Sequence, residues 1–81
     1  MNEEQDIYKS SDLAIVAFLY LLGHSLIEVE NTKFGKSFFF FKNSKKLEID
    51  LEDFWQKDAR VEPQEYFDSI KKIKTRIYQD Y

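Results

Sequence analysis

Four consecutive phenylalanines constrain the fold of this chain more than any other feature of its sequence. Aromatic side chains suit the pleated surface of a sheet, so residues 36–42, which contain them, are predicted to form a strand. Neighbouring side chains of a strand point to opposite faces, so Phe38 and Phe40 share one face while Phe39 and Phe41 share the other. A single layer of helices can cover only one of these two pairs.

A second strand is predicted just before the phenylalanines, over residues 24–30. Its side chains alternate, with Ile27 and Val29 on one face and two glutamates on the other. Residues 31–35 include an asparagine and a glycine, which favour a turn, so the two strands are predicted to pair as an antiparallel hairpin. If Ile27 and Val29 mark the core side, the opposite face carries Leu26 beside one phenylalanine pair.

Three helices are predicted around this hairpin. Residues 13–22 are apolar on every face, which is typical of a helix buried on all sides, and Gly23 favours the left-handed backbone that ends many helices. A second helix is predicted to begin at Ser44 and to end near residues 57–60. A third is predicted to begin at Pro63, because a proline at the first helical position costs no hydrogen bond.

The predicted fold is therefore α+β in the order α-β-β-α-α, with an antiparallel hairpin packed on three helices. Residues 1–9 are predicted to be a loose N-terminal arm, with docking of Ile7 and Tyr8 on the body left open as an alternative. A chain of 81 residues has room for one hydrophobic core, so residues 1–81 are predicted to be a single domain. The predicted core contains apolar residues from all of these elements: Ile15, Val16, Leu19, Leu22, Ile27, Val29, Leu51, Phe54, Trp55, Phe67, Ile70, Ile73 and Ile77.

Composition narrows the cellular setting. The chain contains no cysteine, which excludes disulfides and thiolate metal ligands and favours an intracellular protein. Residues 13–22 are the longest apolar run, and they are too short for a membrane-spanning helix, which needs about 20 residues. The first residues are acidic, whereas a signal peptide begins with positive charge. The protein is predicted to be cytoplasmic, without membrane contact.

No residue pattern indicates a catalytic or metal site. His24 is the only histidine and no nucleophile motif accompanies it, so it is interpreted as a polar residue at a junction between helix and strand. The densest group of acids lacks the glycine and spacing of a calcium-binding loop, so it is interpreted as a solvated helix face. This group consists of Glu48, Asp50, Glu52 and Asp53. The chain is predicted not to be an enzyme and to need no metal or cofactor.

Three interpretations are open for the second phenylalanine pair. In the first, the N-terminal arm or the third helix covers it, and all four rings belong to the core. In the second, Phe38–Phe41 and Leu26 bind a protein, either a second copy that enlarges the sheet or a different protein that adds a strand. In the third, bases of single-stranded nucleic acid stack on the rings while lysines contact phosphates, although the net charge of −3 argues against this role. These lysines are Lys33, Lys36, Lys42, Lys45 and Lys46. A non-enzymatic interaction module is the main hypothesis, and nucleic-acid binding is the alternative.

Three segments together carry a resemblance: Tyr8–Ala14 (YKSSDLA), Glu52–Trp55 (EDFW) and Val61–Phe67 (VEPQEYF). In this order they resemble a small family of bacterial and phage proteins catalogued only as a domain of unknown function, over about residues 7–78. The unbroken phenylalanine run departs from the mixture of aliphatic and aromatic residues expected in that family. The resemblance implies a shared fold and a bacterial or phage intracellular setting, and it brings no established activity or catalytic residues.

Overall fold

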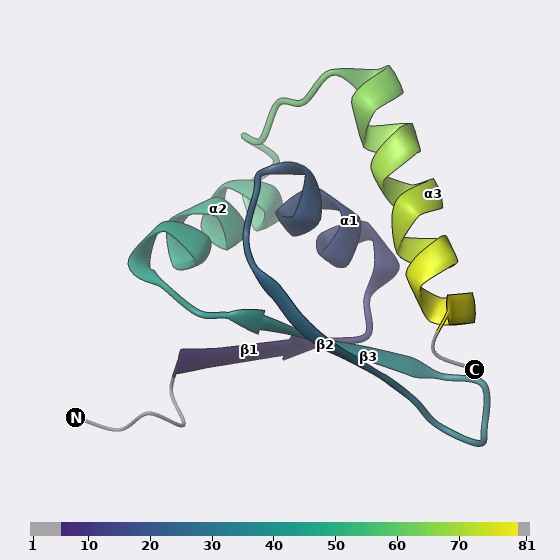
Figure 1. Cartoon of the computed structure of the whole chain (residues 1–81). Helices are drawn as coiled ribbons and strands as arrows, with labels where there is room; N and C mark the ends of the chain where they lie inside the picture. Colours follow the sequence, from purple (N-terminus) through teal and green to yellow (C-terminus); the bar gives the residue numbers. More distant parts are fainter. Residues whose placement is uncertain (1–5, 80–81) are drawn as a thin grey trace.

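The computed structural model describes residues 6–79, which form three strands and three helices. Their order along the chain is β1 (Ile7–Ser10), α1 (Leu13–Leu21), β2 (Leu26–Asn31), β3 (Ser37–Lys42), α2 (Lys45–Trp55) and α3 (Pro63–Gln79). The three helices lie on one side of the sheet, and its other side faces away from them (Figure 1). The α+β class, the hairpin and the three helices are confirmed, and one strand is added to the predicted order.

The added strand is β1, which pairs antiparallel with β3, so that the phenylalanine strand lies in the middle of the order β1-β3-β2. The arm is not loose from Ile7 onward, and Tyr8 packs against the core as the alternative allowed, while residues 1–5 lie outside the described part of the chain. A four-residue strand has too short a pattern to be recognised alone. It forms because β3 offers a second edge of unpaired backbone groups, and because Tyr8 lies opposite Phe41 on the core side.

The hairpin contains a β-bulge that changes which side chains face the core. In the register, Leu26 lies opposite Phe41 and Val29 opposite Phe39, with a shift between Leu26 and Glu28. One extra residue shifts the alternation by one position, so Leu26 points to the core and Ile27 points away from it. The prediction that Ile27 belongs to the core was wrong, since its side chain is 51% exposed.

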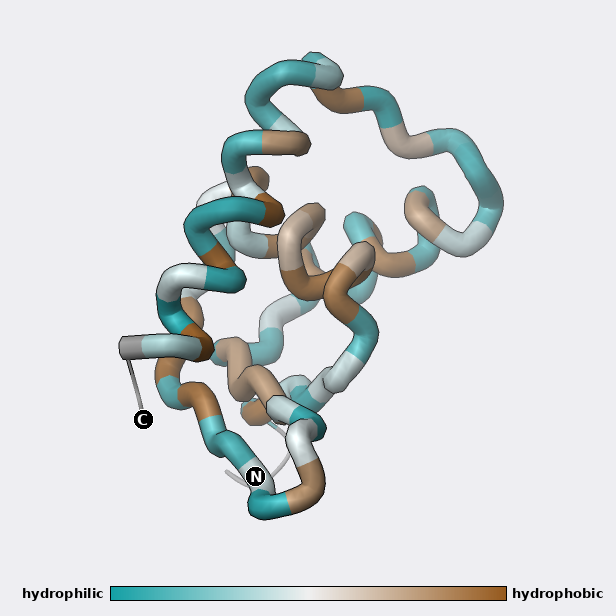
Figure 2. The backbone as a smooth tube through the Cα atoms, turned by 90° about the vertical axis from the view of Figure 1, so that its right-hand side faces the viewer, coloured by the Kyte–Doolittle hydropathy of each residue, from teal (hydrophilic) through white to brown (hydrophobic). Residues whose placement is uncertain are grey.

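Helix α1 lies at the centre of the fold, as predicted. Five consecutive residues, 15–19, are buried, and Figure 2 shows this part of the tube as a mostly brown stretch in the middle of the molecule. The Asp12 carboxylate caps the helix by accepting a hydrogen bond of 3.0 Å from the backbone N–H of Ala14. At the other end Gly23 adopts a φ of 93°, the left-handed conformation expected of a residue that ends a helix.

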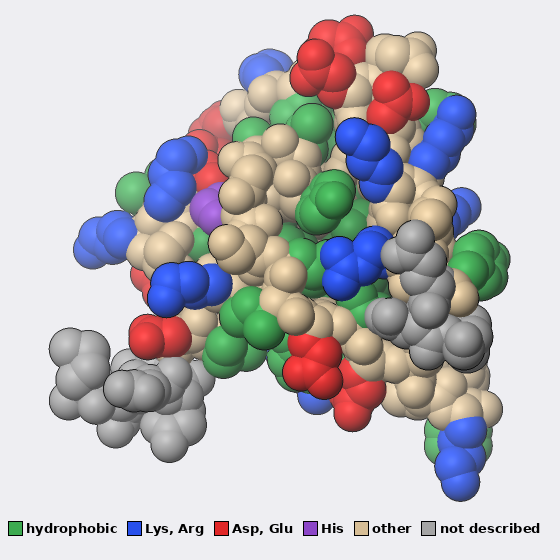
Figure 3. Space-filling model, in the orientation of Figure 1, with side chains coloured by type: hydrophobic (Ala, Val, Ile, Leu, Met, Phe, Trp, Pro, Cys, Tyr) green, Lys and Arg blue, Asp and Glu red, His purple; other side chains and the backbone are tan. Residues whose placement is uncertain are grey.

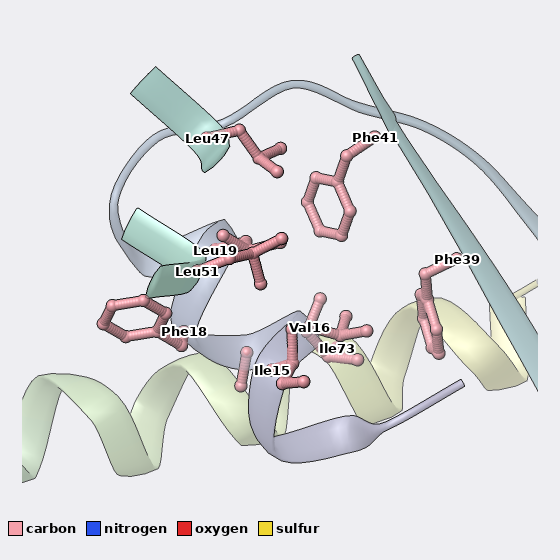
Figure 4. Close-up of a cluster of buried hydrophobic side chains, with 10 residues drawn as sticks. Ile15, Val16, Phe18, Leu19, Phe39, Phe41, Leu47, Leu51 and Ile73 are labelled. Atoms are coloured by element: carbon pink, nitrogen blue, oxygen red, sulfur yellow. The ribbon is translucent and has the colours of Figure 1, made fainter. Parts of the chain in front are cut away.

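The core lies between α1, the sheet and the apolar stripes of α2 and α3. Phe41 points from β3 toward Leu47 of α2, and Phe39 lies closer to Ile73 of α3 (Figure 4). Sequence reasoning left Phe18 and Leu47 out of the predicted core, although both are buried. Apart from four exposed residues, every residue of the predicted core belongs to the buried cluster or packs against it.

The exposed exceptions are Leu22, Ile27, Trp55 and Phe67, and the helical ones lie at the margins of their stripes. With 3.6 residues per turn, Trp55 lies about 80° around α2 from Leu47, while Phe67 lies about 120° around α3 from Ile73. Leu22 follows the last residue of α1 as its C-cap. The core predictions for these residues were wrong because spacing identifies an apolar stripe but does not fix how the helix is rotated against its neighbours.

Candidate functional site

The register defines the side of the sheet that faces away from the helices. Side chains that lie opposite each other on neighbouring strands share a face, so the partners of Phe38, Phe40 and Lys42 can be assigned to this side. We call it the outer sheet face. It consists of Ile7 and Lys9 on β1, Lys36, Phe38, Phe40 and Lys42 on and beside β3, and Ile27, Glu28 and Glu30 on β2.

The two phenylalanine pairs have different environments. Phe39 and Phe41 are 2% and 0% exposed and belong to the core, whereas Phe38 and Phe40 are only half-buried on the outer sheet face. The pattern of alternation is confirmed, and it is the even-numbered pair that points outward. Leu26 packs against the core beside Phe41, so the prediction that it lies next to the outward pair was wrong, and the bulge is the cause.

No described segment lies over the outer sheet face. The strand β1 pairs along the edge of β3 instead of crossing it, and α3 packs on α1 in the helical layer. The arm covers the outward rings in part, through the Lys9 side chain, but neither ring belongs to the core cluster or packs against it, so the interpretation in which all four rings are core was wrong for residues 6–79. What lies on the rings is lysine: the Lys9 Nζ is 4.5 Å from the centroid of Phe38 and 5.5 Å from that of Phe40, and the Lys36 Nζ is 5.9 Å from Phe38.

Charges on the outer sheet face are separated by sign. Lys9 on β1 and Glu28 on β2 lie on either side of Phe40, and Glu30 lies beside Phe38. Within residues 6–79, none of these three charged side chains forms an ion pair. Figure 3 shows red acidic side chains along the lower edge of the molecule, where Figure 1 places β2. The face thus carries Lys9 at one margin, glutamates at the other, and the two rings in the middle with Lys36 and Lys42 at the ends of the central strand.

The five lysines of the nucleic-acid hypothesis fall into two groups. Lys33 and Lys36 lie at the hairpin loop, while the others lie at the far end of β3 and in the first turn of α2: Lys42, Lys45 and Lys46. The six residues of β3 separate the groups by about 20 Å at 3.3 Å per residue. Lys46 is engaged in an ion pair with Asp50, and two glutamates lie on the same face between the groups. The five lysines, predicted to form one basic cluster because they are close in sequence, therefore lie in two separate groups in the structure.

A second group of polar side chains is centred on the buried carboxylate of Asp50 on α2. The His24 Nε2 is 2.6 Å from one carboxylate oxygen of Asp50, and the Lys46 Nζ is 2.8 Å from the other. Burial acts to raise the pKa of Asp50, but the hydrogen bonds from Lys46 and His24 outweigh it and hold this pKa below its ordinary value. The cluster ties α2 to the segment that follows α1.

The solvated-face interpretation of the acids was wrong for one member. Glu48, Glu52 and Asp53 are exposed, but Asp50 is buried. Sequence reasoning missed its pairing with His24, although one signal existed: Asp50 lies within about 60° of Leu47 around the helix, at the margin of the apolar stripe. In the described part of the chain, no three His, Asp or Glu side chains gather in a way that could hold a metal ion.

A second exposed aromatic site lies at the tip of the hairpin. Phe34 is 89% exposed, and together with Tyr78 it lines a groove of about 530 Å³ between the hairpin loop and the end of α3. The Asn31 side chain fixes these two elements together by donating a hydrogen bond of 3.0 Å to the backbone carbonyl of Ile77. None of the helices formed by residues 6–79 combines the length and the apolar character needed to cross a bilayer.

Comparison with known proteins gives a family and no function. A family model described as Domain of unknown function (DUF5659) matches residues 5–79. No curated protein and no solved structure gives a significant match. The resemblance inferred from the sequence is confirmed at the level of the family, and what the chain does has to be inferred from its own residues.

Proposed function

We propose that this chain, which belongs to the DUF5659 family of domains of unknown function, is a non-enzymatic protein-interaction module that docks through the outer sheet face. The observation that carries the proposal is the half-buried pair Phe38 and Phe40 in the middle of a face that no described element covers. We place its action in the cytoplasm, in the bacterial or phage setting implied by the sequence resemblance.

The chemistry of the face supports binding over simple solvation. An antiparallel sheet with one face on the core usually carries polar side chains on its other face. Here the central strand carries two aromatic rings at these positions, with Ile7 and Ile27 exposed at either side. Keeping the apolar surface of a phenylalanine ring in water costs about 25 cal/mol of free energy per Å² relative to burying it. A partner that covers the rings recovers this free energy, which a polar face would not offer.

Position-specific photo-cross-linking in the native cells tests this proposal. A photoreactive amino acid replaces Glu30 on the outer sheet face, and in a control protein it replaces Lys72, which is exposed on α3. We expect discrete protein adducts from position 30 and none of the same mass from position 72. A further variant with Phe38→Thr and Phe40→Thr should lose the adducts. Equal adducts at both positions, or adducts that survive loss of the rings, would contradict docking through this face.

Nucleic-acid binding is the weaker candidate, because the lysines are divided and two glutamates share the outer sheet face. It is tested by titrating a labelled oligothymidylate into the protein at about 50 mM and about 200 mM salt. Phosphate contacts would give binding that weakens steeply with salt. We expect no saturable binding at either concentration, and a salt-sensitive affinity lost in a Lys33→Ala, Lys36→Ala variant would favour the nucleic-acid function instead.

A further inference from the structure

We infer, on the basis of the proposed function, that the partner of the outer sheet face is a second copy of this chain, packed face to face about a two-fold axis that runs along β3. The argument starts from the cross-strand rows. The row through the ring of Phe40 contains Lys9 on β1 and Glu28 on β2, and the next row places Glu30 beside Phe38. The two edge strands therefore carry opposite charges, with the aromatic rings between them and Lys36 and Lys42 at the two ends of the central strand.

A two-fold axis parallel to β3 exchanges the two edge strands and keeps each residue at its position along the strand. Lys9 of one copy then lies opposite Glu28 of the other, and the reverse pair forms by symmetry. Phe38 and Phe40 meet the same residues of the second copy in the middle. Lys36 and Lys42 meet their own counterparts at the two ends of the strand, where they can turn to solvent. An axis perpendicular to the strands would place Lys9 opposite Lys9 and glutamates opposite glutamates. The charge pattern therefore selects one of the two arrangements.

The isolated chain leaves these charges uncompensated. Within residues 6–79, Lys9 lies over the rings of Phe38 and Phe40 and forms no ion pair, and neither Glu28 nor Glu30 has a cationic partner. The two glutamates are alternate residues of one edge strand, so they stand on the same face about 7 Å apart and repel each other. A lysine supplied by a second copy relieves this repulsion, and the same contact is made twice in the dimer. A partner with one sign of charge would match only half of the face.

The dimensions of the face predict a weak, reversible dimer. Three strands about 4.8 Å apart and a central strand about 20 Å long give a footprint of about 300 Å². A standard stable interface buries about 800 Å² on each partner. Association through this face should therefore depend on concentration and, because charged pairs contribute to it, should weaken as salt rises.

Sedimentation equilibrium with charge-reversal variants tests the inference, over chain concentrations from about 10 μM to about 1 mM. The first variant is Lys9→Glu, which makes both margins anionic, and the second is Glu28→Lys with Glu30→Lys, which makes both cationic. We expect each variant alone to associate at least tenfold more weakly than the natural chain. An equimolar mixture of the two should regain association close to that of the natural chain, because the positions of Lys9 and Glu28 again face each other with opposite signs.

Two controls complete the experiment. A single chain with all three reversals, Lys9→Glu, Glu28→Lys and Glu30→Lys, should dimerise like the natural chain because the complementarity is restored. Lys72→Glu makes the same charge change as Lys9→Glu at an exposed position on α3, and it should leave association unchanged. Circular dichroism confirms that each variant is folded, which is expected since all the changed side chains are exposed.

Several results would overturn the inference. A natural chain that stays monomeric to about 1 mM excludes the second copy as partner. If photo-adducts to a different protein persist at position 30, the proposed function survives this result; if they are missing as well, both fail. A dimer that tolerates every charge reversal must form elsewhere, such as by pairing of the free edge of β1, and also contradicts the face-to-face arrangement.

Discussion

Among single residues, the buried pair of Asp50 and His24 makes a specific contribution to the stability of the fold. Asp50 lies on the buried side of α2, where a carboxylate is tolerated because His24 and Lys46 both contact its oxygens. Removing the charge leaves these partners facing a poorer acceptor. Lys46 can turn to solvent, but His24 is itself largely buried, so most of the loss falls on the contact between the two buried groups.

We expect Asp50→Asn to lower the free energy of unfolding at pH 7 by about 1–3 kcal/mol, the usual cost of weakening a buried hydrogen-bonded charge. Urea denaturation measures this value. The exposed neighbour Asp53 provides the control, and Asp53→Asn should change the free energy by less than about 0.5 kcal/mol. Equal losses in the two variants would contradict the structural role assigned to the buried cluster.

The same variant predicts a difference in pH dependence. The pKa of Asp50 is lowered in the folded chain, so the folded state holds this proton less tightly than the unfolded state. Its contribution is therefore complete above the unfolded pKa of about 3.9 and is lost as the pH falls through the lower folded value. As the pH falls from about 5 through the lowered folded pKa of Asp50, the natural chain should lose more stability than Asp50→Asn. Parallel pH profiles of the two chains would show that Asp50 does not contribute to the pH dependence of stability.

At the scale of elements, β3 separates folding from binding within one strand. Its odd-numbered rings complete the core against α1, α2 and α3, while its even-numbered rings belong to the outer sheet face. The strand also pairs with both β1 and β2, so its backbone groups are satisfied on each side. A strand of this kind can vary on one face without losing the fold.

This separation predicts unequal costs along β3. Phe41→Ala should lower the free energy of unfolding by about 3–5 kcal/mol, because it leaves a cavity in the packed core. Phe40→Ala should cost about 1 kcal/mol, since its ring is only half-buried and lies outside the core. Chemical denaturation of the two variants compares the neighbouring positions directly. A larger loss at position 40 would mean that the assignment of the faces is reversed.

The pairing of β1 makes a prediction for hydrogen exchange. Amides of β3 lie between two strands, so we expect them to exchange more slowly than amides of β1, which lies at the edge. Amides of β1 should in turn be slower than those in the hairpin loop, residues 33–35, where the structure has no strand pairing. Exchange of Ile7–Ser10 as fast as that of the loop would restore the picture of a loose arm.

At the scale of the whole molecule, the helices occupy one side of the sheet and leave the other side for contact (Figure 1). Stability and binding should therefore respond to different substitutions. Phe38→Thr with Phe40→Thr should reduce stability by less than about 2 kcal/mol, because threonine suits a strand and both rings are only half-buried, outside the core. The same change should abolish both the photo-adducts and the self-association.

The matched control for this variant is Phe34→Ser at the hairpin tip. It removes the more exposed ring, so it lowers non-specific stickiness at least as much, but it lies outside the outer sheet face. Self-association should be unchanged in Phe34→Ser, as measured by sedimentation equilibrium. Loss of association in this variant would move the contact to the groove between the hairpin loop and α3.

The sequence by itself determined the features that depend on near neighbours. Caps, glycines and apolar spacing located the three helices, because a helix is defined by contacts within four residues. Alternation in the phenylalanine run determined that two rings must leave the core. Only the tertiary structure decided which two, because a bulge in β2 reversed the sides of Leu26 and Ile27. The tertiary structure also paired β1 with β3 and placed His24 against Asp50. These contacts link residues far apart in the chain, so no local sequence pattern could predict them.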